Sequence, residues 1–185
     1  MPAIADSRIL IMATHGYEET TLIRPRDELS AQGAKVDVAA PEAGEIKGWQ
    51  HNDWDKSVKA DMTLEEVKVG EYDALILPGG LMIPDTLRIN DTAMAIIKAF
   101  LEMGKVVAAM CHAPALLIEA GAVKGRDVTS YLSIRTDMIN AGGRWVDHQV
   151  VVDRGIITSR HPADLDAFIA KTVEHVEEVP HPRTS

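Results

Sequence analysis

The 185-residue sequence has a single cysteine, Cys111, which excludes an internal disulfide. Its cysteine and histidines form no cluster with the spacing of a structural zinc site. It also lacks the Gly-x-Gly-x-x-Gly and Gly-Lys-Ser/Thr motifs, which argues against a bound dinucleotide or nucleoside triphosphate. We therefore expect neither a metal nor an organic cofactor.

Basic residues are scarce, with 19 Lys and Arg against 28 Asp and Glu, and the formal net charge is -9. Such a chain repels phosphate backbones and anionic bilayers, and no basic cluster offsets this. No apolar run approaches the roughly 18 residues that cross a bilayer, and the first residues do not resemble a signal peptide. We expect a cytoplasmic protein with no nucleic-acid or membrane partner.

Short apolar runs alternate with longer amphipathic stretches, a pattern typical of parallel strands joined by helices. With 46% hydrophobic residues and no linker, the sequence predicts one α/β domain over residues 1–185, ending in a short disordered tail at 180–185. The predicted strands are residues 8–13, 35–40, 73–77, 105–110, 128–131, 145–152 and 155–159. The predicted helices are residues 20–32, 91–103, 112–120, 134–141 and 162–179.

Residues 42–62 form the longest stretch without a clear period, and we predict an irregular loop there. Its Trp49 and Trp54 either cover a site or bury at a subunit interface, and the enrichment of aromatics at interfaces favours the second. The segment after it, residues 63–66, reads Thr-Leu-Glu-Glu and fits a capping box at the start of a short helix.

The most informative segment is residues 105–120, KVVAAMCHAPALLIEA, where Cys111 falls at the junction of a buried strand and a helix. The small residues Ala109 and Ala113 flank it and permit a sharp turn of the nucleophile-elbow type. A cysteine at a helix start has a lowered pKa, so we predict a reactive thiolate at neutral pH. A lone cysteine can also be a small buried hydrophobe, but its place at this corner favours reactivity.

His112 follows directly and is a candidate base for the thiol, although adjacent residues on a turn often point apart. A carboxylate would be needed to orient its ring. Glu18, Glu19 and Asp85 all follow predicted strands, where an open parallel sheet places its site, and spacing does not choose among them.

Gly79 and Gly80 follow another buried strand in the sequence Pro-Gly-Gly. Without side chains, their backbone N–H groups could face an anion and form an oxyanion hole. A plain turn is the commoner role of such a pair, so this signal is weak alone.

With these pieces placed, the chain resembles the ThiJ/PfpI superfamily, relatives of class I glutamine amidotransferases, and within it the PfpI branch. The resemblance rests on LILPGG at residues 75–80, AAMCHAP at 108–114, AGAVKGRDVTSY at 120–131, DMINAGGRWVD at 137–147 and ITSRHPADL at 157–165.

The resemblance implies a flavodoxin-like three-layer sandwich with a mostly parallel central sheet and Cys111 as nucleophile on the elbow, with His112 beside it. Backbone amides around Gly79 and Gly80, and those after Cys111 including Ala113, would line the oxyanion position. It further implies a homo-oligomer, a dimer or an assembly of dimers, in which Asp85 approaches the histidine from a neighbouring subunit.

One departure concerns the first helix, where the family commonly carries a glutamate that hydrogen-bonds the cysteine. Thr21 stands at that position, and its hydroxyl cannot titrate near neutral pH. Glu18 is the nearby candidate to replace the missing acid.

Our first functional hypothesis is a cysteine-dependent enzyme whose Cys111 thiolate attacks an electrophilic carbonyl. The substrate would be a small dicarbonyl or its protein adduct, as for a glyoxalase or deglycase, or a peptide bond. Dicarbonyls are favoured because a peptide needs a strong leaving-group acid. The alternative is a non-enzymatic stress-response protein with Cys111 as an oxidation sensor, or a chaperone-like role.

Overall fold

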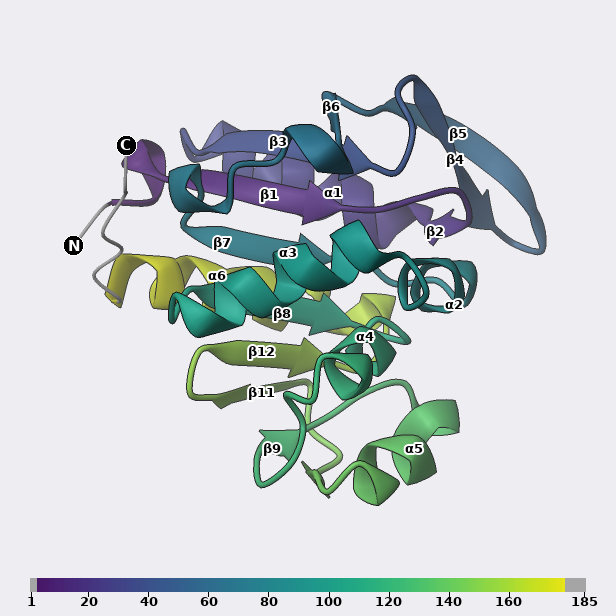
Figure 1. Ribbon diagram of the computed structural model, residues 1–185, viewed down its shortest axis with the longest axis vertical. Coiled ribbons are helices and arrows are strands. Elements are labelled where there is room, and N and C mark those ends of the chain that lie inside the picture. Colours follow the sequence, from purple (N-terminus) through teal and green to yellow (C-terminus); the bar gives the residue numbers. More distant parts are fainter. Residues whose placement is uncertain (1–2, 179–185) are drawn as a thin grey trace.

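The computed structural model describes residues 3–178, and its centre is a seven-stranded sheet in the order β11-β12-β8-β7-β1-β3-β6. Every neighbouring pair in it is parallel except β11 with β12. The arrowheads of the parallel strands therefore all point to one edge (Figure 1). The strands are β1 (Arg8–Met12), β3 (Lys35–Ala40), β6 (Met62–Thr63), β7 (Ala74–Leu77), β8 (Val106–Met110), β11 (Val150–Asp153) and β12 (Ile156–Ser159).

Helices cover both faces of this sheet, which confirms the predicted flavodoxin-like three-layer sandwich. In the view of Figure 1, α3 lies in front of the sheet, and α1 and α6 lie behind it and contact each other. The α-helices are α1 (Glu19–Ala31), α2 (Met82–Leu87), α3 (Asp91–Glu102), α4 (Pro114–Glu119), α5 (Arg135–Asn140) and α6 (Leu165–Glu178). The 3-10 helices are η1 (Ile4–Asp6), η2 (Leu64–Glu66), η3 (Val69–Glu71), η4 (Leu132–Ile134) and η5 (Pro162–Asp164).

The central strands are apolar along their whole length because both of their faces are covered. Every residue of β7 and of β8 is buried, as are the last four residues of β1. This explains why runs such as ALIL and VVAAM show no alternation of polar and apolar residues. The core thereby fixes the carboxyl ends of β7 and β8 side by side.

The prediction of an irregular loop over residues 42–62 is wrong. This segment forms a hairpin of β4 (Glu45–Gln50) and β5 (Asp53–Lys59), and β4 also pairs with β2 (Tyr17–Glu18). The turn residues His51 and Asn52 both have positive φ, 49° and 64°, as a tight two-residue hairpin requires. The alternation was obscured because most of β5 is exposed and polar on both faces.

Several predicted boundaries also need correction. The predicted strand 128–131 reduces to β9 (Asp127–Val128), and the strand 145–152 divides into β10 (Arg144–Trp145) and β11. The capping box at residues 63–66 is present and begins η2. The predicted end of the last helix at residue 179 and the tail at 180–185 lie outside the described residues.

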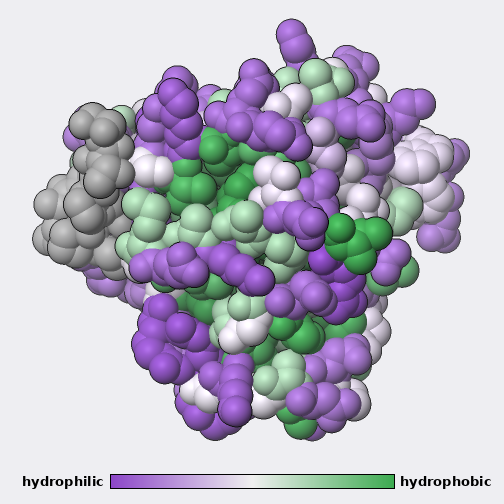
Figure 2. Space-filling view, viewed as in Figure 1, coloured by the Kyte–Doolittle hydropathy of each residue, from purple (hydrophilic) through white to green (hydrophobic). Residues whose placement is uncertain are grey.

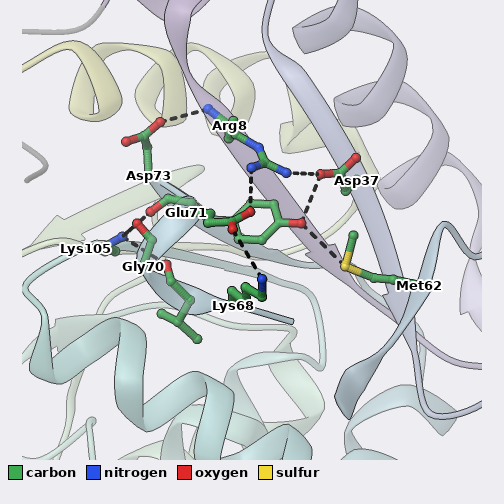
Figure 3. A network of polar contacts seen from close by, with 10 residues as sticks. Arg8, Asp37, Met62, Lys68, Gly70, Glu71, Asp73 and Lys105 are labelled. Carbon is green, nitrogen blue, oxygen red and sulfur yellow. Dashed lines mark hydrogen bonds and ion pairs between the residues drawn. The ribbon is translucent and has the colours of Figure 1, made fainter. Parts of the chain in front are cut away.

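A polar network crosses the edge of the sheet opposite the carboxyl ends (Figure 3). Arg8 donates to Asp37 at 3.1 Å and to Glu71 at 2.7 Å, and the Tyr72 hydroxyl donates to Asp37 at 2.9 Å. The buried Lys105 ammonium donates to three backbone carbonyls, those of Val69, Gly70 and Tyr72. These contacts join β1, β3 and η3 to the start of β8. They stabilise the amino-terminal edge of the parallel strands, which lies opposite the carboxyl ends.

Polar side chains cover much of the face seen in Figure 2, and apolar side chains reach the surface in patches between them. Among the large apolar side chains, Leu81 and Leu132 are each 68% exposed. No helix within residues 3–178 has the length and apolar character to span a membrane.

Candidate active site

Cys111 occupies a sharp turn at the carboxyl end of β8. Its φ of 61° is a left-handed value that non-glycine residues rarely adopt. The turn is held by two backbone hydrogen bonds, from Cys111 N to Ser159 O at 3.0 Å and from Ala113 N to Met110 O at 2.9 Å. A strained residue between a central strand and a helix is the geometry of a nucleophile elbow, as predicted from the flanking alanines.

The predicted low pKa of Cys111 is wrong for this chain. The cysteine is 6% exposed, and burial raises the pKa of its thiol to about 11, because a thiolate loses solvation in an apolar site. Hydrogen bonds from the backbone N–H groups of Gly80 and His112 lower this pKa, but by less. The helix contributes little because α4 begins at Pro114, three residues after the sulfur.

His112 faces the sulfur, so the adjacent residues do not point apart. Its Nδ1 lies 3.2 Å from Cys111 Sγ. Burial also lowers the pKa of the His112 ring below its ordinary value of 6.5, since the charged form is penalised. At neutral pH the site therefore holds a thiol beside a neutral imidazole, and the imidazole can accept the thiol proton.

The backbone amides predicted to line an oxyanion position divide into two groups. The N–H groups of Gly80 and His112 are directed at the sulfur. The N–H of Gly79 instead donates to Thr21 Oγ1 at 2.8 Å, and that of Ala113 donates to Met110 O. The prediction for the amides of Gly79 and Ala113 is therefore corrected, because each already has an acceptor.

Gly79 serves the site through its lack of a side chain. A Cβ on Gly79 would lie 2.9 Å from Cys111 Cβ, which is closer than real Cβ atoms approach. Gly80 has a φ of 114°, and a Cβ there would lie 2.6 Å from Gly16 O. The Pro-Gly-Gly turn thus packs directly against the cysteine.

Thr21 and Glu18 both lie close to the site but are engaged with the backbone. The Thr21 hydroxyl donates to Glu18 O at 2.8 Å while it accepts the N–H of Gly79. The Glu18 carboxylate caps α1 by accepting from Thr21 N at 2.9 Å and from the Thr20 hydroxyl. Its negative charge raises the pKa of Cys111, after burial as the main cause.

Asp85 lies on α2 with an exposed side chain and lines the same surface pocket as His112. Within residues 3–178 of one chain it has no hydrogen bond or ion pair with the His112 ring. Of the three carboxylates considered, Glu19 pairs instead with Lys56 Nζ at 2.9 Å, beneath the β4–β5 hairpin.

Two contacts of His112 have no signal in the sequence. Its Nε2 lies 3.0 Å from Ser133 Oγ, and its ring stacks on Tyr131, with ring centres 4.6 Å apart. Tyr131 N donates to Cys111 O at 2.8 Å, and this hydrogen bond holds the segment at Tyr131 against the turn at Cys111. Tyr131 and Ser133 lie 19 and 21 positions after His112 and reach it only through the connection after α4, so spacing alone could not reveal the pairing.

Trp49 and Trp54 pack edge to face on the hairpin, with ring centres 5.2 Å apart and Trp54 48% exposed. Burial of this pair at a subunit interface stays a prediction. Among the described residues, no three His, Cys, Asp or Glu side chains form a group able to hold a metal ion.

The fold and the elbow define an α/β protein with a cysteine at the carboxyl edge of a mostly parallel sheet. The sequence model of the DJ-1/PfpI family matches residues 7–175. The chain belongs to the DJ-1/PfpI family, which confirms the resemblance found in the sequence.

Relatives of this chain include named enzymes. It is 44% identical over 167 residues to Deglycase PfpI of Pyrococcus furiosus, covering 90% of this chain and 98% of that protein. It is 38% identical to Protein/nucleic acid deglycase 2 of Escherichia coli, covering 87% and 92% of the two chains. The crystal structure of Drosophila melanogaster DJ-1beta has a TM-score of 0.82 and 29% identity, covering 93% of this chain and 94% of that one.

Proposed function

We propose that this protein is a cysteine-dependent enzyme of the deglycase type that acts on small dicarbonyls or their protein adducts. The observation that carries the proposal is the Cys111–His112 pair, with Sγ and Nδ1 3.2 Å apart on a strained elbow. The deglycase names of relatives that share most of the chain's length support the same reaction class.

The first step follows from the protonation states of the pair. As Sγ attacks the carbonyl carbon, its proton passes to His112 Nδ1, and the carbonyl π electrons move to oxygen. The product is a tetrahedral thiohemiacetal oxyanion. The N–H groups of Gly80 and His112 already face the sulfur and are placed to donate to that oxygen.

A neutral pair suits dicarbonyls better than peptides. The carbonyls of a dicarbonyl are activated electrophiles, and the addition needs no departing amine. Peptide hydrolysis would need His112 to protonate the leaving nitrogen, and within one chain the ring has no hydrogen-bonded carboxylate among residues 3–178 to support it. We therefore assign the substrate to the dicarbonyl class.

The deciding experiment compares the wild type with Cys111→Ala on methylglyoxal, on a methylglyoxal adduct of an arginine peptide, and on an unmodified peptide. We expect wild-type turnover of the first two and none with Cys111→Ala. His112→Gln should lower kcat about 100-fold, the scale of a lost general base. The matched control is His148→Gln, at an exposed histidine outside the pair, which should keep wild-type activity. Activity retained by Cys111→Ala would end the proposal.

The sensor alternative requires a thiolate that solvent oxidants reach. Cys111 is a buried thiol with a raised pKa, which favours the enzyme. Mass spectrometry after mild peroxide separates the two: rapid, selective oxidation of Cys111 without dicarbonyl turnover would support the sensor.

The homo-oligomer and the cross-subunit role of Asp85 stay predictions. The exposed Leu81 beside Asp85 in the His112 pocket is consistent with a covering partner. Analytical ultracentrifugation gives the subunit number, and Asp85→Asn tests whether this carboxylate affects turnover.

A further inference from the structure

The His112 ring is held on three sides by residues of its own chain. Nδ1 faces Cys111 Sγ at 3.2 Å, Nε2 faces Ser133 Oγ at 3.0 Å, and Tyr131 stacks on the ring plane. Ser133 belongs to η4, which the hydrogen bond from Tyr131 N to Cys111 O anchors beside the turn. Both ring nitrogens therefore have a partner without any second subunit.

The partner of Nε2 affects how well His112 acts as a base. A neutral imidazole carries one hydrogen, and Nδ1 accepts the proton of Sγ only when that hydrogen is on Nε2. In this tautomer Nε2–H donates to the hydroxyl oxygen of Ser133, and it still does so after Nδ1 has taken the proton. In the other tautomer the Ser133 hydroxyl donates to Nε2, Nδ1–H points at the sulfur, and no base faces the thiol.

We propose that Ser133 is the positioning residue of His112: its hydroxyl holds the ring with Nδ1 toward Sγ, and it accepts from Nε2–H once Nδ1 has taken the Cys111 proton. This inference rests on the proposed function, because it concerns the same base. Ser133 takes the place that a carboxylate fills in a Ser-His-Asp triad. A hydroxyl carries no charge, so it fixes the ring without the full stabilisation that a carboxylate gives the imidazolium.

Other ionisable groups surround the ring. Cys111 and Tyr131 contact it, and Asp85 of α2 and Arg88, which follows α2, line the same pocket without a hydrogen bond to it within residues 3–178. Glu18 at the start of α1 acts on the sulfur. Of the described contacts of His112, only that with Ser133 satisfies Nε2.

The first test is kinetic and compares Ser133→Ala with Ser133→Thr on methylglyoxal. Ser133→Ala should lower kcat about tenfold with little change in KM. It should also move the acid limb of kcat/KM to lower pH, because the imidazolium loses a hydrogen-bond acceptor. Ser133→Thr should restore both, since it keeps the hydroxyl. The matched control Ser30→Ala, at an exposed serine of α1, should behave as wild type.

The second test reads the ring directly and needs no turnover. A nitrogen-15 NMR titration of the His112 ring should give a lower pKa in Ser133→Ala than in the wild type, because the imidazolium loses the acceptor for Nε2–H. An unchanged His112 pKa and pH profile in Ser133→Ala would overturn the inference. So would an acid limb that moves with Asp85→Asn but not with Ser133→Ala, because the partner subunit would then orient the ring. A wild type inactive on dicarbonyls, together with the predicted change of the His112 pKa in Ser133→Ala, would refute the proposed function alone.

Discussion

The Cys111 thiol should remain protonated far above neutral pH. Its burial raises the pKa to about 11. At pH 7 about one molecule in ten thousand would then hold a thiolate, because each pH unit below the pKa reduces the fraction tenfold. An ordinary cysteine with a pKa of about 8.5 would be ionised in about 3% of molecules at the same pH.

The rate of alkylation by iodoacetamide between pH 6 and 11, followed by intact mass, measures this directly. Because Cys111 is the one cysteine of the sequence, each mass increment reports this site. We expect the rate to rise about tenfold per pH unit up to pH 10, as the thiolate fraction does. The same chain unfolded in urea is the control and should level off above pH about 9. A plateau between pH 6 and 8 in the folded protein would mean a resting thiolate and would refute the reasoning.

The same shift has a consequence for stability. The folded pKa lies above the unfolded value, so folding favours the protonated thiol, and this contribution is complete below pH about 8.5. It is lost as the pH rises to about 11. A shift of about 2.5 units corresponds to about 3 kcal/mol. The free energy of unfolding of the wild type should fall by this amount relative to Cys111→Ala between pH 8 and 11, and parallel curves would contradict it.

Three further predictions follow from packing and charge. Gly79→Ala should lose activity and about 1–3 kcal/mol of stability, because its Cβ meets Cys111; wild-type urea unfolding would disprove this. Asp164→Asn should cost about 1–3 kcal/mol at pH 7 by weakening the Arg160 pair. Burial raises the pKa of Asp164, but hydrogen bonds from Arg160 outweigh this effect and lower the pKa. The difference in unfolding free energy between the wild type and Asp164→Asn should therefore shrink below pH about 4, where the carboxylate becomes protonated. Equal stability of the two proteins at every pH would show that the ion pair contributes nothing. Tyr72→Phe should lose about 1 kcal/mol in thermal unfolding, and an unchanged Tm would show that its hydroxyl contributes nothing.

The sequence predicts the layers of this fold well because buried parallel strands must be apolar. The apolar sequence runs that form β1, β7 and β8 are almost entirely buried, so the sequence identifies them clearly as core strands. The β4–β5 hairpin could not be predicted from the sequence, for the opposite reason. It stands away from the core with β5 largely exposed, so no burial imposes a period on it.

For the site, the local sequence predicts the position of Cys111 well but does not predict its pKa. The elbow at Cys111 follows from small residues at a strand end, and those are visible in the sequence. The pKa depends on how much protein surrounds the sulfur, and Gly79, Ser159 and Tyr131 come close to Cys111 only after folding. The pairing of Ser133 with His112 likewise depends on a turn that brings together residues 21 positions apart.

The left-handed backbone at Cys111 also bears on the first step of the proposed reaction. The left-handed main chain sets the direction of the Cα–Cβ bond, and Gly79 packs closely against Cβ. The free-energy cost of this strained backbone is therefore part of folding and is not added when a substrate binds. In the proposed reaction a carbonyl would meet a preorganised atom, and binding energy would remain available for the chemical step itself.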